Sequence, residues 1–223
     1  MIQPLEKSES RKVIYSVLIV IGLHICWLLT SLFVRDMAIA GRMLITRITY
    51  WMCFGAICWY AARIEKQPLL LWPEKPHPFV FYIGSVILIL LVIVLIAASI
   101  ALPLSRMGFK PSNLVLQILT LPLSIKLYTV ITAGVLEELV FRGYIQSRLQ
   151  LLFKTEYPPI LLSALCFGLL HASYGTLINI LMPFIIGLIF AFHYYKYRNI
   201  KILIICHLLI DANALLHTTI PTH

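Results

Sequence analysis

The sequence predicts an all-α protein, a polytopic bundle of about seven transmembrane helices within a range of six to eight. Hydrophobic residues make up 61% of the 223 residues, and the mean hydropathy is +0.93. Charged residues account for 12%, whereas a soluble domain usually has roughly 25%. Apolar runs of about 20 residues recur along the chain, and a helix needs this length to cross a bilayer.

The formal charge of +9 comes from basic residues that lie between the apolar runs. This placement favours contacts with anionic lipid and argues against nucleic acid as a partner. One set of alternate connectors holds eleven basic residues, namely Lys7, Arg11, Lys12, Arg63, Lys66, Lys75, Arg148, Lys154, Lys196, Arg198 and Lys201, and the other holds four, namely Arg35, Arg42, Arg106 and Lys110. The positive-inside rule therefore predicts a cytoplasmic N-terminus and an external C-terminus. The small size and the lack of a targeting extension favour a prokaryotic plasma membrane.

The first two predicted spans lie close together near the N-terminus. Val13–Val34 has 22 residues without a charge, which exceeds the roughly 7–15 residues of a signal-peptide core and predicts a retained helix. The second span runs from Met43 to Ala62. Arg47, near one end of it, is expected to snorkel to the membrane interface. The aromatic residues of this span are typical of interfacial belts that anchor a helix in lipid: Tyr50, Trp51, Trp59 and Tyr60.

A third predicted span covers the 24 uncharged residues Phe79–Leu102 and is expected to end at Pro103. It follows a polar, proline-rich connector at residues 63–78. None of the first three spans carries a polar motif. We therefore divide the single membrane domain into an N-terminal part, residues 1–113, and a second part, residues 114–223, that carries the motifs.

The second part begins with a long apolar segment, residues 114–152, in which Pro122 is the expected break. Three shorter spans follow, with a tight turn at residues 173–175 between the first two; they are Ile160–Ala172, residues 176–195 and Ile202–Ile220. All five cysteines of the chain fall in apolar runs without a zinc-type spacing, which predicts buried, inert thiols. They are Cys26, Cys53, Cys58, Cys166 and Cys206.

Five charged residues interrupt the long apolar segment: Lys126, Glu137, Glu138, Arg142 and Arg148. Glu137, Glu138 and Arg142 lie within six residues of one another. Ionisable groups are costly inside a membrane, so they indicate a functional site. Residues i and i+4 share one face of a helix, so Glu138 can pair with Arg142. Glu137 points about 100° away from that face, and it needs a partner from another segment.

Two further pairs have the same spacing. Phe167 precedes His171 by four residues in one span, and His207 precedes Asp211 by four residues in the last span. Polar helix faces in lipid must meet one another, so these groups are expected to converge with Glu137. A glutamate, two histidines and an aspartate in a dry cavity could activate water, with a carboxylate as general base. The alternative is a set of structural hydrogen bonds between helices.

The expected depths of these residues do not agree with one another. At about 1.5 Å per residue, Glu137 and His171 lie ~20–25 Å from the cytoplasmic boundary, whereas His207 lies only ~9 Å from Lys201. Either the last helix starts deeper in the membrane or the boundaries are misplaced. The remaining intramembrane histidines, His24 and His193, are expected to have structural roles.

The three motifs resemble those of the CPBP family, also called the Abi family, which includes CAAX prenyl endopeptidases and bacteriocin-processing enzymes. Its members share Glu-Glu-x-x-x-Arg, Phe-x-x-x-His and His-x-x-x-Asn or Asp in this order. The corresponding residues here are Glu137, Glu138 and Arg142, then Phe167 and His171, then His207 and Asp211. The resemblance covers about residues 115–217. It implies an intramembrane endopeptidase that acts on a membrane-embedded or lipid-anchored protein or peptide, such as a CAAX-type protein or a peptide precursor.

The resemblance also implies a role for each motif residue. Glu137, together with His171, would activate the attacking water. Glu138 and Arg142 would hold the helix and tune the base, and Phe167 would support the second motif.

The third motif, His207 and Asp211, would stabilise the oxyanion. An ionised aspartate only accepts hydrogen bonds, so Asp211 must be protonated or must orient His207 instead. A zinc-dependent version of the same protease is the alternative, because Glu137, His171, His207 and Asp211 would make an acceptable zinc set. The metal-free interpretation is preferred, and no cofactor is expected.

Two other classes of protein stay open. A non-proteolytic membrane scaffold, such as an immunity protein with the same fold, would be indicated by loss of a motif residue, and none is lost apart from the question of Asp211. An ion-coupled transporter would show internal repeats with paired broken helices. The sequence shows no such repeat.

Overall fold

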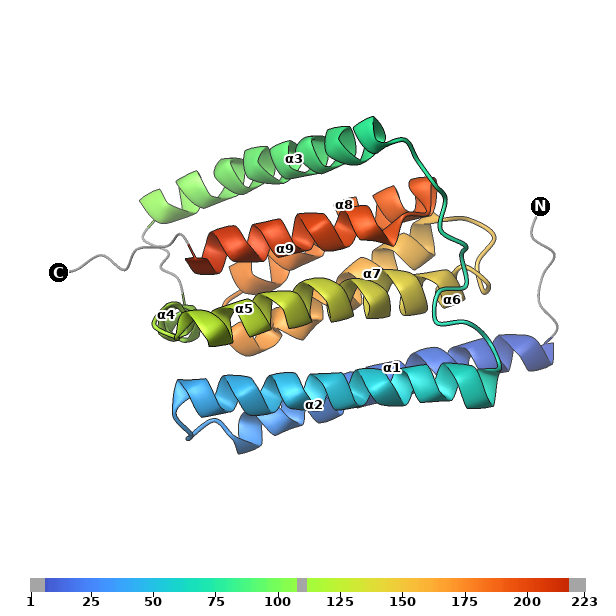
Figure 1. Ribbon diagram of the computed structural model, residues 1–223, viewed down its shortest axis with the longest axis horizontal. Helices are drawn as coiled ribbons and strands as arrows, with labels where there is room; N and C mark the ends of the chain where they lie inside the picture. Colours follow the sequence, from blue (N-terminus) through green and yellow to red (C-terminus); the bar gives the residue numbers. More distant parts are fainter. Residues whose placement is uncertain (1–6, 108–111, 217–223) are drawn as a thin grey trace.

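The computed structural model describes residues 7–107 and 112–216 (Figure 1). Within these ranges the chain forms helices and connecting turns without a strand, which confirms the all-α prediction. The elements are α1 (Lys7–Phe33), α2 (Ile39–Tyr60), η1 (Ala61–Glu65), α3 (Phe79–Arg106), α4 (Asn113–Leu119), α5 (Leu123–Thr132), η2 (Ala133–Glu137), η3 (Leu139–Gln146), α6 (Ser147–Leu149), α7 (Tyr157–Leu170), η4 (His171–Tyr174), α8 (Ile178–Tyr197) and α9 (Ile200–Leu216). Lys110 and the expected end of the last span, residues 217–220, lie outside the described residues.

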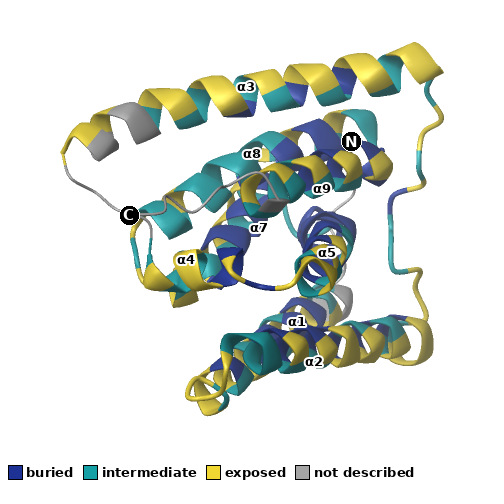
Figure 2. Ribbon diagram, turned by 60° about the vertical axis from the view of Figure 1, so that its left-hand side comes forward, coloured by how far each residue is buried: buried dark blue, intermediate teal, exposed yellow. Residues whose placement is uncertain are grey.

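Most of the helices run between the same two ends of the molecule (Figure 1). α1 and α2 pack together as a pair on one side, and α3 lies on the opposite side. The helices that carry the motifs lie between them. Figure 2 shows exposed residues along α3, whereas buried residues concentrate in the centre of the bundle. The centre is therefore where charged side chains are shielded from the surroundings.

Three helical segments of the described chain are long and apolar enough to cross a membrane: Ser10–Phe33, Phe79–Ile100 and Ile178–Tyr197. There is a fourth if the bent pair Asn113–Leu119 and Leu123–Leu149 counts as one span. These segments establish an integral membrane protein. The predicted number of seven spans is not confirmed. α7 and α9 have only 14 and 17 residues, and α2, although it has 22 residues, is not among the candidate spans. The division at residue 113 also stays a prediction.

The predicted break at Pro122 is confirmed. α4 ends at Leu119, α5 begins at Leu123, and the two axes are bent by 119°. The helix then continues, but Ala133–Glu137 and Leu139–Gln146 are π-helical. Such turns are wider than α-helical turns, and they are frequent at functional sites. The Glu-Glu-x-x-x-Arg motif therefore lies in a widened part of the helix.

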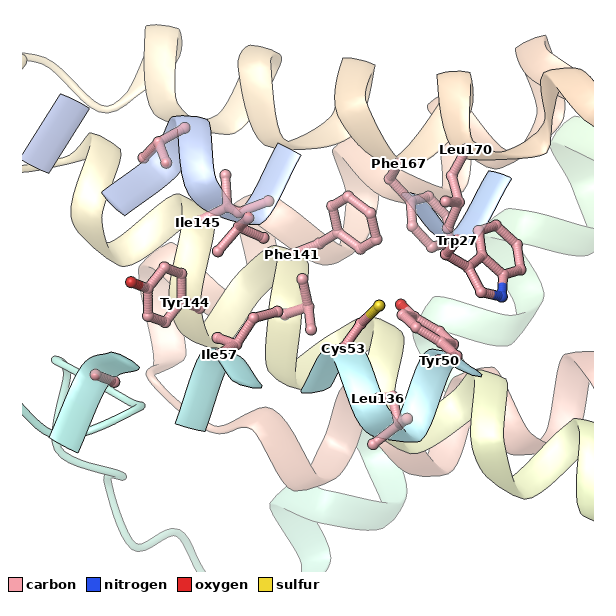
Figure 3. Close-up of a cluster of buried hydrophobic side chains, with 14 of the residues drawn as sticks. Trp27, Tyr50, Cys53, Ile57, Leu136, Phe141, Tyr144, Ile145, Phe167 and Leu170 are labelled. Carbon is pink, nitrogen blue, oxygen red and sulfur yellow. The ribbon is translucent and has the colours of Figure 1, made fainter. Parts of the chain in front are cut away.

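An apolar core joins the N-terminal helix pair to the motif helices (Figure 3). Trp27 of α1, Tyr50 of α2, Phe141 of η3 and Phe167 of α7 contribute its large side chains. The indole of Trp27 donates to the carbonyl oxygen of Thr46 at 2.8 Å, which ties α1 to α2. The interfacial position expected for Tyr50 is wrong, because its side chain is fully buried against the ring of Trp27.

Two glycines allow close approach of the central helices. A Cβ atom at Gly168 of α7 would lie 2.8 Å from Cβ of Phe184 and 3.0 Å from the carbonyl oxygen of Ile180, both on α8. A Cβ atom at Gly134 would lie 2.7 Å from the side chain of Leu208 on α9. Small residues let the backbones of membrane helices pack closely. These contacts bring α8 and α9 against the helices that carry the other motifs.

The connectors at one end of the bundle are held by a buried ion pair. Arg148 donates to the carboxylate of Glu65 with a shortest distance of 2.5 Å, and the hydroxyl of Tyr144 donates to the same group at 2.7 Å. Burial raises the pKa of Glu65, but these hydrogen bonds outweigh it and hold the pKa below its ordinary value. At the same end, Glu74 accepts from the backbone N–H of Ile200 at 3.0 Å and caps the start of α9.

Two further sequence expectations are wrong. α3 continues past Pro103 to Arg106; the proline removes a single backbone hydrogen bond, the one to the carbonyl four residues earlier, and the helix continues for about one more turn. The prediction of buried thiols holds only for Cys53 and Cys206. The side chain of Cys26 is exposed on the outer face of α1, where lipid rather than protein would cover it, and Cys58 and Cys166 are partly buried.

Candidate active site

The polar centre of the bundle is built around Glu138. Its Oε1 accepts from Nη1 of Arg142 at 3.0 Å, and both side chains are fully buried. The same oxygen lies 2.8 Å from Nδ1 of His207 on α9. A carboxylate only accepts, so this ring nitrogen donates. The predicted pair of Glu138 and Arg142 is present, and a histidine from another helix extends it.

Phe167 of α7 packs against three of the polar groups. The guanidinium carbon of Arg142 lies 4.3 Å from the centre of its ring. The rings of His171 and His207 meet it edge-on, with centroid distances of 5.1 and 5.8 Å. Such cation–π and aromatic contacts each contribute about 0.5–2 kcal/mol. Phe167 therefore fixes the relative positions of groups that come from three different helical segments.

Glu137 projects into a cavity of about 300 Å³ and takes no part in the ion pair. Its side chain is 4% exposed, and its Oε2 has no hydrogen-bond partner. Nε2 of His207 lies 3.9 Å from this oxygen, which is too far for a hydrogen bond. The sequence predicted that Glu137 would need a partner from another segment. His207 comes from another segment, but it binds Glu138 instead. His207 lies near both carboxylates, but only Glu138 accepts a hydrogen bond from it.

His171 lines the same cavity, in the 3₁₀ turn that directly follows α7. Its Nδ1 lies 3.0 Å from the carbonyl oxygen of Phe167. A carbonyl oxygen only accepts, so Nδ1 carries the hydrogen, and Nε2 of the neutral ring is an acceptor. No hydrogen bond joins Glu137 to His171 in the described part of the chain. A joint action of the two side chains therefore needs a molecule between them.

Asp211 lies one turn beyond His207 on α9 and completes this wall of the cavity. Its Oδ2 is 3.6 Å from Nε2 of His207, and its side chain is 28% exposed. His207 therefore has Glu138 at one ring nitrogen and the carboxylates of Glu137 and Asp211 near the other. This position beside the imidazole ring favours orientation of His207 as the role of Asp211.

Four polar side chains of the cavity were not identified from the sequence: Arg47, Thr129, Tyr174 and Asn179. Arg47 is 5% exposed and lines the cavity, so the expected snorkelling to the interface is wrong. The reason is that α2 packs against both α1 and α5, and Arg47 faces into the bundle. Its charge inside an apolar run was the one available signal. Uncharged polar residues such as Thr129 are common in membrane helices and gave no signal of a site.

No group of three or more His, Cys, Asp or Glu side chains is placed to hold a metal ion among residues 7–107 and 112–216. Nδ1 of His207 is bound to Glu138, and Nδ1 of His171 is bound to the backbone. Each histidine therefore keeps Nε2 free, as metal-binding histidines also do. The zinc-dependent alternative stays a prediction, and we assign no step of a reaction to a metal.

The discrepancy in depth has two causes. α6 ends at Leu149, well before Lys154, and α9 begins at Ile200. Counted from these ends at about 1.5 Å per residue, Glu137 lies ~18 Å and His207 ~10 Å inside the bundle. The boundaries were therefore partly misplaced. The hydrogen bond from His207 to the motif helix shows that α9 also starts deeper than α6 ends.

The fold and the site define a helical membrane protein with a cavity inside the bundle that is lined by glutamate, histidine and aspartate. Residues 118–213 match the family of type II CAAX prenyl endopeptidases described as Rce1-like. All three motifs lie within the matched residues, and the match confirms the resemblance to the CPBP family. The matched family is one of peptidases, and the match covers less than half of the chain. The chain matches no curated protein and no solved structure significantly.

Proposed function

We propose that the chain is an intramembrane endopeptidase in which Glu137 activates a water molecule. The observation that carries the proposal is the buried Oε2 of Glu137, which has no hydrogen-bond partner and borders a cavity shared with His171, His207 and Asp211. A buried polar atom without a partner costs free energy, and such groups in membrane proteins are typically functional. Adjacent Glu138 is occupied by its ion pair, so one carboxylate has a structural task and the other is available for chemistry.

In the proposed reaction, the water oxygen attacks the carbonyl carbon of a peptide bond while Glu137 accepts a proton from the water. A carbon–oxygen bond forms, and the former carbonyl oxygen takes up the negative charge. Collapse of this intermediate breaks the carbon–nitrogen bond, and Glu137 returns the proton to the leaving nitrogen. The acceptor Nε2 of His171 can hold the water or share its proton.

His207 is the group that we assign to the developing oxyanion. Its Nδ1 is fixed by Glu138, so Nε2, when protonated, can donate into the cavity. Asp211 would keep the ring in this orientation, and Arg142 would hold Glu138. Donors that are already in position stabilise charge in the transition state without reorganisation. This assignment uses every motif residue without a metal ion.

Members of the matched family are CAAX prenyl endopeptidases, so we propose a membrane-associated prenylated protein, or a lipid-anchored peptide precursor, as the substrate. We further propose a prokaryotic plasma membrane with the N-terminus in the cytoplasm. The basic connectors support this orientation because they meet at one end of the bundle. Arg148 contacts Glu65 there, and the N–H of Lys75 donates to the carbonyl oxygen of Arg198 at 2.9 Å.

The test compares protein termini in membranes that carry equal amounts of the wild type or the variant Glu137→Gln. We expect new N-termini and C-termini with the wild type only, because glutamine cannot accept the proton of the water. The variant Glu156→Gln is the matched control, since Glu156 directly precedes α7, does not line the cavity and makes no capping hydrogen bond with its side chain. Its termini should equal those of the wild type.

If the Glu137→Gln membranes show the same termini as the wild type, the catalytic assignment is wrong. If no protein gains a terminus with the wild type, the chain is better explained as a non-proteolytic scaffold. A search for stable membrane partners would then be the next experiment.

A further inference from the structure

The cavity contains one buried arginine that the proposed reaction does not use. Arg47 comes from α2, outside the matched residues 118–213, and its side chain is 95% buried. It lines the cavity together with Glu137, His171, His207 and Asp211. An arginine at this depth is costly, so its retention inside the bundle requires a reason.

The guanidinium group of Arg47 has no ion pair within the described residues. Its Nε has no hydrogen-bond partner, and no carboxylate oxygen lies within 4.0 Å of it. It interacts with Glu137 and Asp211 only at longer range, and the hydroxyl of Tyr174 is near it. Arg142, by contrast, is paired with Glu138 at 3.0 Å. Arg47 is thus the cavity cation whose charge is not matched by direct contact with a carboxylate.

Other unused donors line the same cavity. Nδ2 of Asn179 and the hydroxyl of Thr129 are buried without hydrogen-bond partners. The unpartnered Oε2 of Glu137 is an acceptor of the same cavity. The cavity therefore offers a cation with neutral donors in addition to a carboxylate. This is the lining expected for a ligand that brings an anionic oxygen group together with a bond to be hydrolysed.

We propose that Arg47 binds the carboxyl-terminal carboxylate of the peptide substrate, a proposal that rests on the proposed peptidase function. A guanidinium group matches a carboxylate with two parallel hydrogen bonds, which are stronger when both partners are charged and desolvated. Arg47 and Glu137 line the same cavity, so the bound terminus and the bond to be cut would lie in one space. A cavity of about 300 Å³ suits the last few residues of a chain. Arg47 would thereby select substrates that are cut close to a free C-terminus.

The test measures binding to the full-length chain in lipid nanodiscs that carries Glu137→Gln, so that bound peptide is not consumed. The probes are two fluorescent peptides, each with an S-farnesyl cysteine followed by three aliphatic residues, ending in a free carboxylate or in a carboxamide. With Arg47 present, the free acid should bind about tenfold or more tightly than the amide, as expected for one charge-assisted contact. With Arg47→Gln this preference should fall to about twofold or less, and Arg47→Lys should keep part of it.

The matched control is Arg42→Gln, an arginine of the same helix that does not line the cavity. It should keep the full preference for the free acid. Three results would each overturn the proposal. They are an unchanged preference for the free acid in Arg47→Gln, an equal loss of binding of both peptides in that variant, and no binding of either peptide to the protein that retains Arg47. A thermal melt of each variant establishes that it is folded, and Arg47→Lys preserves the charge if Arg47→Gln does not fold.

Cleavage by the wild type separates this proposal from the peptidase assignment. If both peptides bind with the expected preference but neither is cut, the carboxylate site stands and the peptidase function fails. If both are cut at equal rates, the peptidase function stands and the carboxylate site fails.

Discussion

Glu137 and Glu138 are neighbours in sequence, and each has a buried Oε2 without a hydrogen-bond partner. They differ at two other points. Oε1 of Glu138 accepts hydrogen bonds from Arg142 and His207, whereas Glu137 lines the cavity. The contacts of Glu138 and the position of Glu137 at the cavity together support the structural and reactive roles proposed for them.

The role assigned to Asp211 gives a prediction at the same scale. Replacing it with alanine removes the group beside Nε2 of His207, and we expect kcat to fall about tenfold or more, corresponding to ~1.4 kcal/mol at the transition state. Asp211→Asn keeps the shape and one acceptor oxygen, so it should retain most of the activity. The measurement is the cleavage rate of the farnesylated peptide by purified protein.

Asn213 supplies the control for this prediction, because it is exposed, lies two residues further along α9 and does not line the cavity. Asn213→Ala should cleave at the wild-type rate. A loss in Asp211→Asn as large as that in Asp211→Ala would mean that the negative charge itself is required, and orientation of the ring would then be the wrong explanation.

Local spacing predicted some of these contacts but not others. The pair of Glu138 and Arg142 followed from the i,i+4 rule, because both residues belong to one helix. The sequence did not predict that His207 would form its hydrogen bond with Glu138 rather than with Glu137. This pairing depends on the π-helical turns around the motif, which change the direction of each side chain from that in a regular α-helix. No periodicity in the sequence marks those turns.

At the scale of elements, the position of Arg47 is likewise a feature that the local sequence did not predict. Composition and proline placement predicted helices and the break at Pro122, since these depend on the segment itself. The direction in which α2 faces depends on its packing against α1 and α5, which the sequence of α2 alone does not determine. An apolar helix with one arginine is compatible with lipid on every side, so the cavity residue was mistaken for an interfacial one.

The contact between α7 and α8 gives a prediction for elements. Gly168→Ala would place a methyl group 2.8 Å from Cβ of Phe184 and 3.0 Å from a backbone oxygen, and the backbone cannot yield without moving α8. We expect a loss of about 1–3 kcal/mol in stability, the usual range for overpacking. Reduced activity should accompany it, because Phe167 beside Gly168 positions Arg142 and His207.

Gly55→Ala is the control for this substitution, since a Cβ atom there meets nothing within 4 Å. It should be neutral or slightly stabilising, because alanine favours a helix. Thermal unfolding of both variants in the same detergent checks the prediction, and an equal effect of the two alanines would contradict the packing argument.

At the scale of the molecule, two kinds of contact join the N-terminal helix pair to the motif helices. Inside the bundle the contact is the apolar core around Tyr50 and Phe141 (Figure 3). At the end with the basic connectors it is Glu65, which follows α2 and accepts from Arg148 and Tyr144. Arg47 can line the cavity only while this assembly holds α2 in place. The joining of the two parts therefore belongs to the function as well as to the fold.

The ion pair of Glu65 makes this joining sensitive to acid. Its pKa is lower in the folded protein than the ordinary value of 4.5, because the hydrogen bonds from Arg148 and Tyr144 outweigh the effect of burial. The unfolded chain therefore binds the proton more readily, so the stabilisation is present above pH 4.5 and is lost as the pH falls through the folded pKa. We expect the difference in Tm between the wild type and Glu65→Gln to shrink as the pH is lowered from 6 towards 3. Glu156→Gln, with no such contacts, should show no pH-dependent difference, and a constant difference for Glu65→Gln would mean that charge does not contribute to the joining of the two parts.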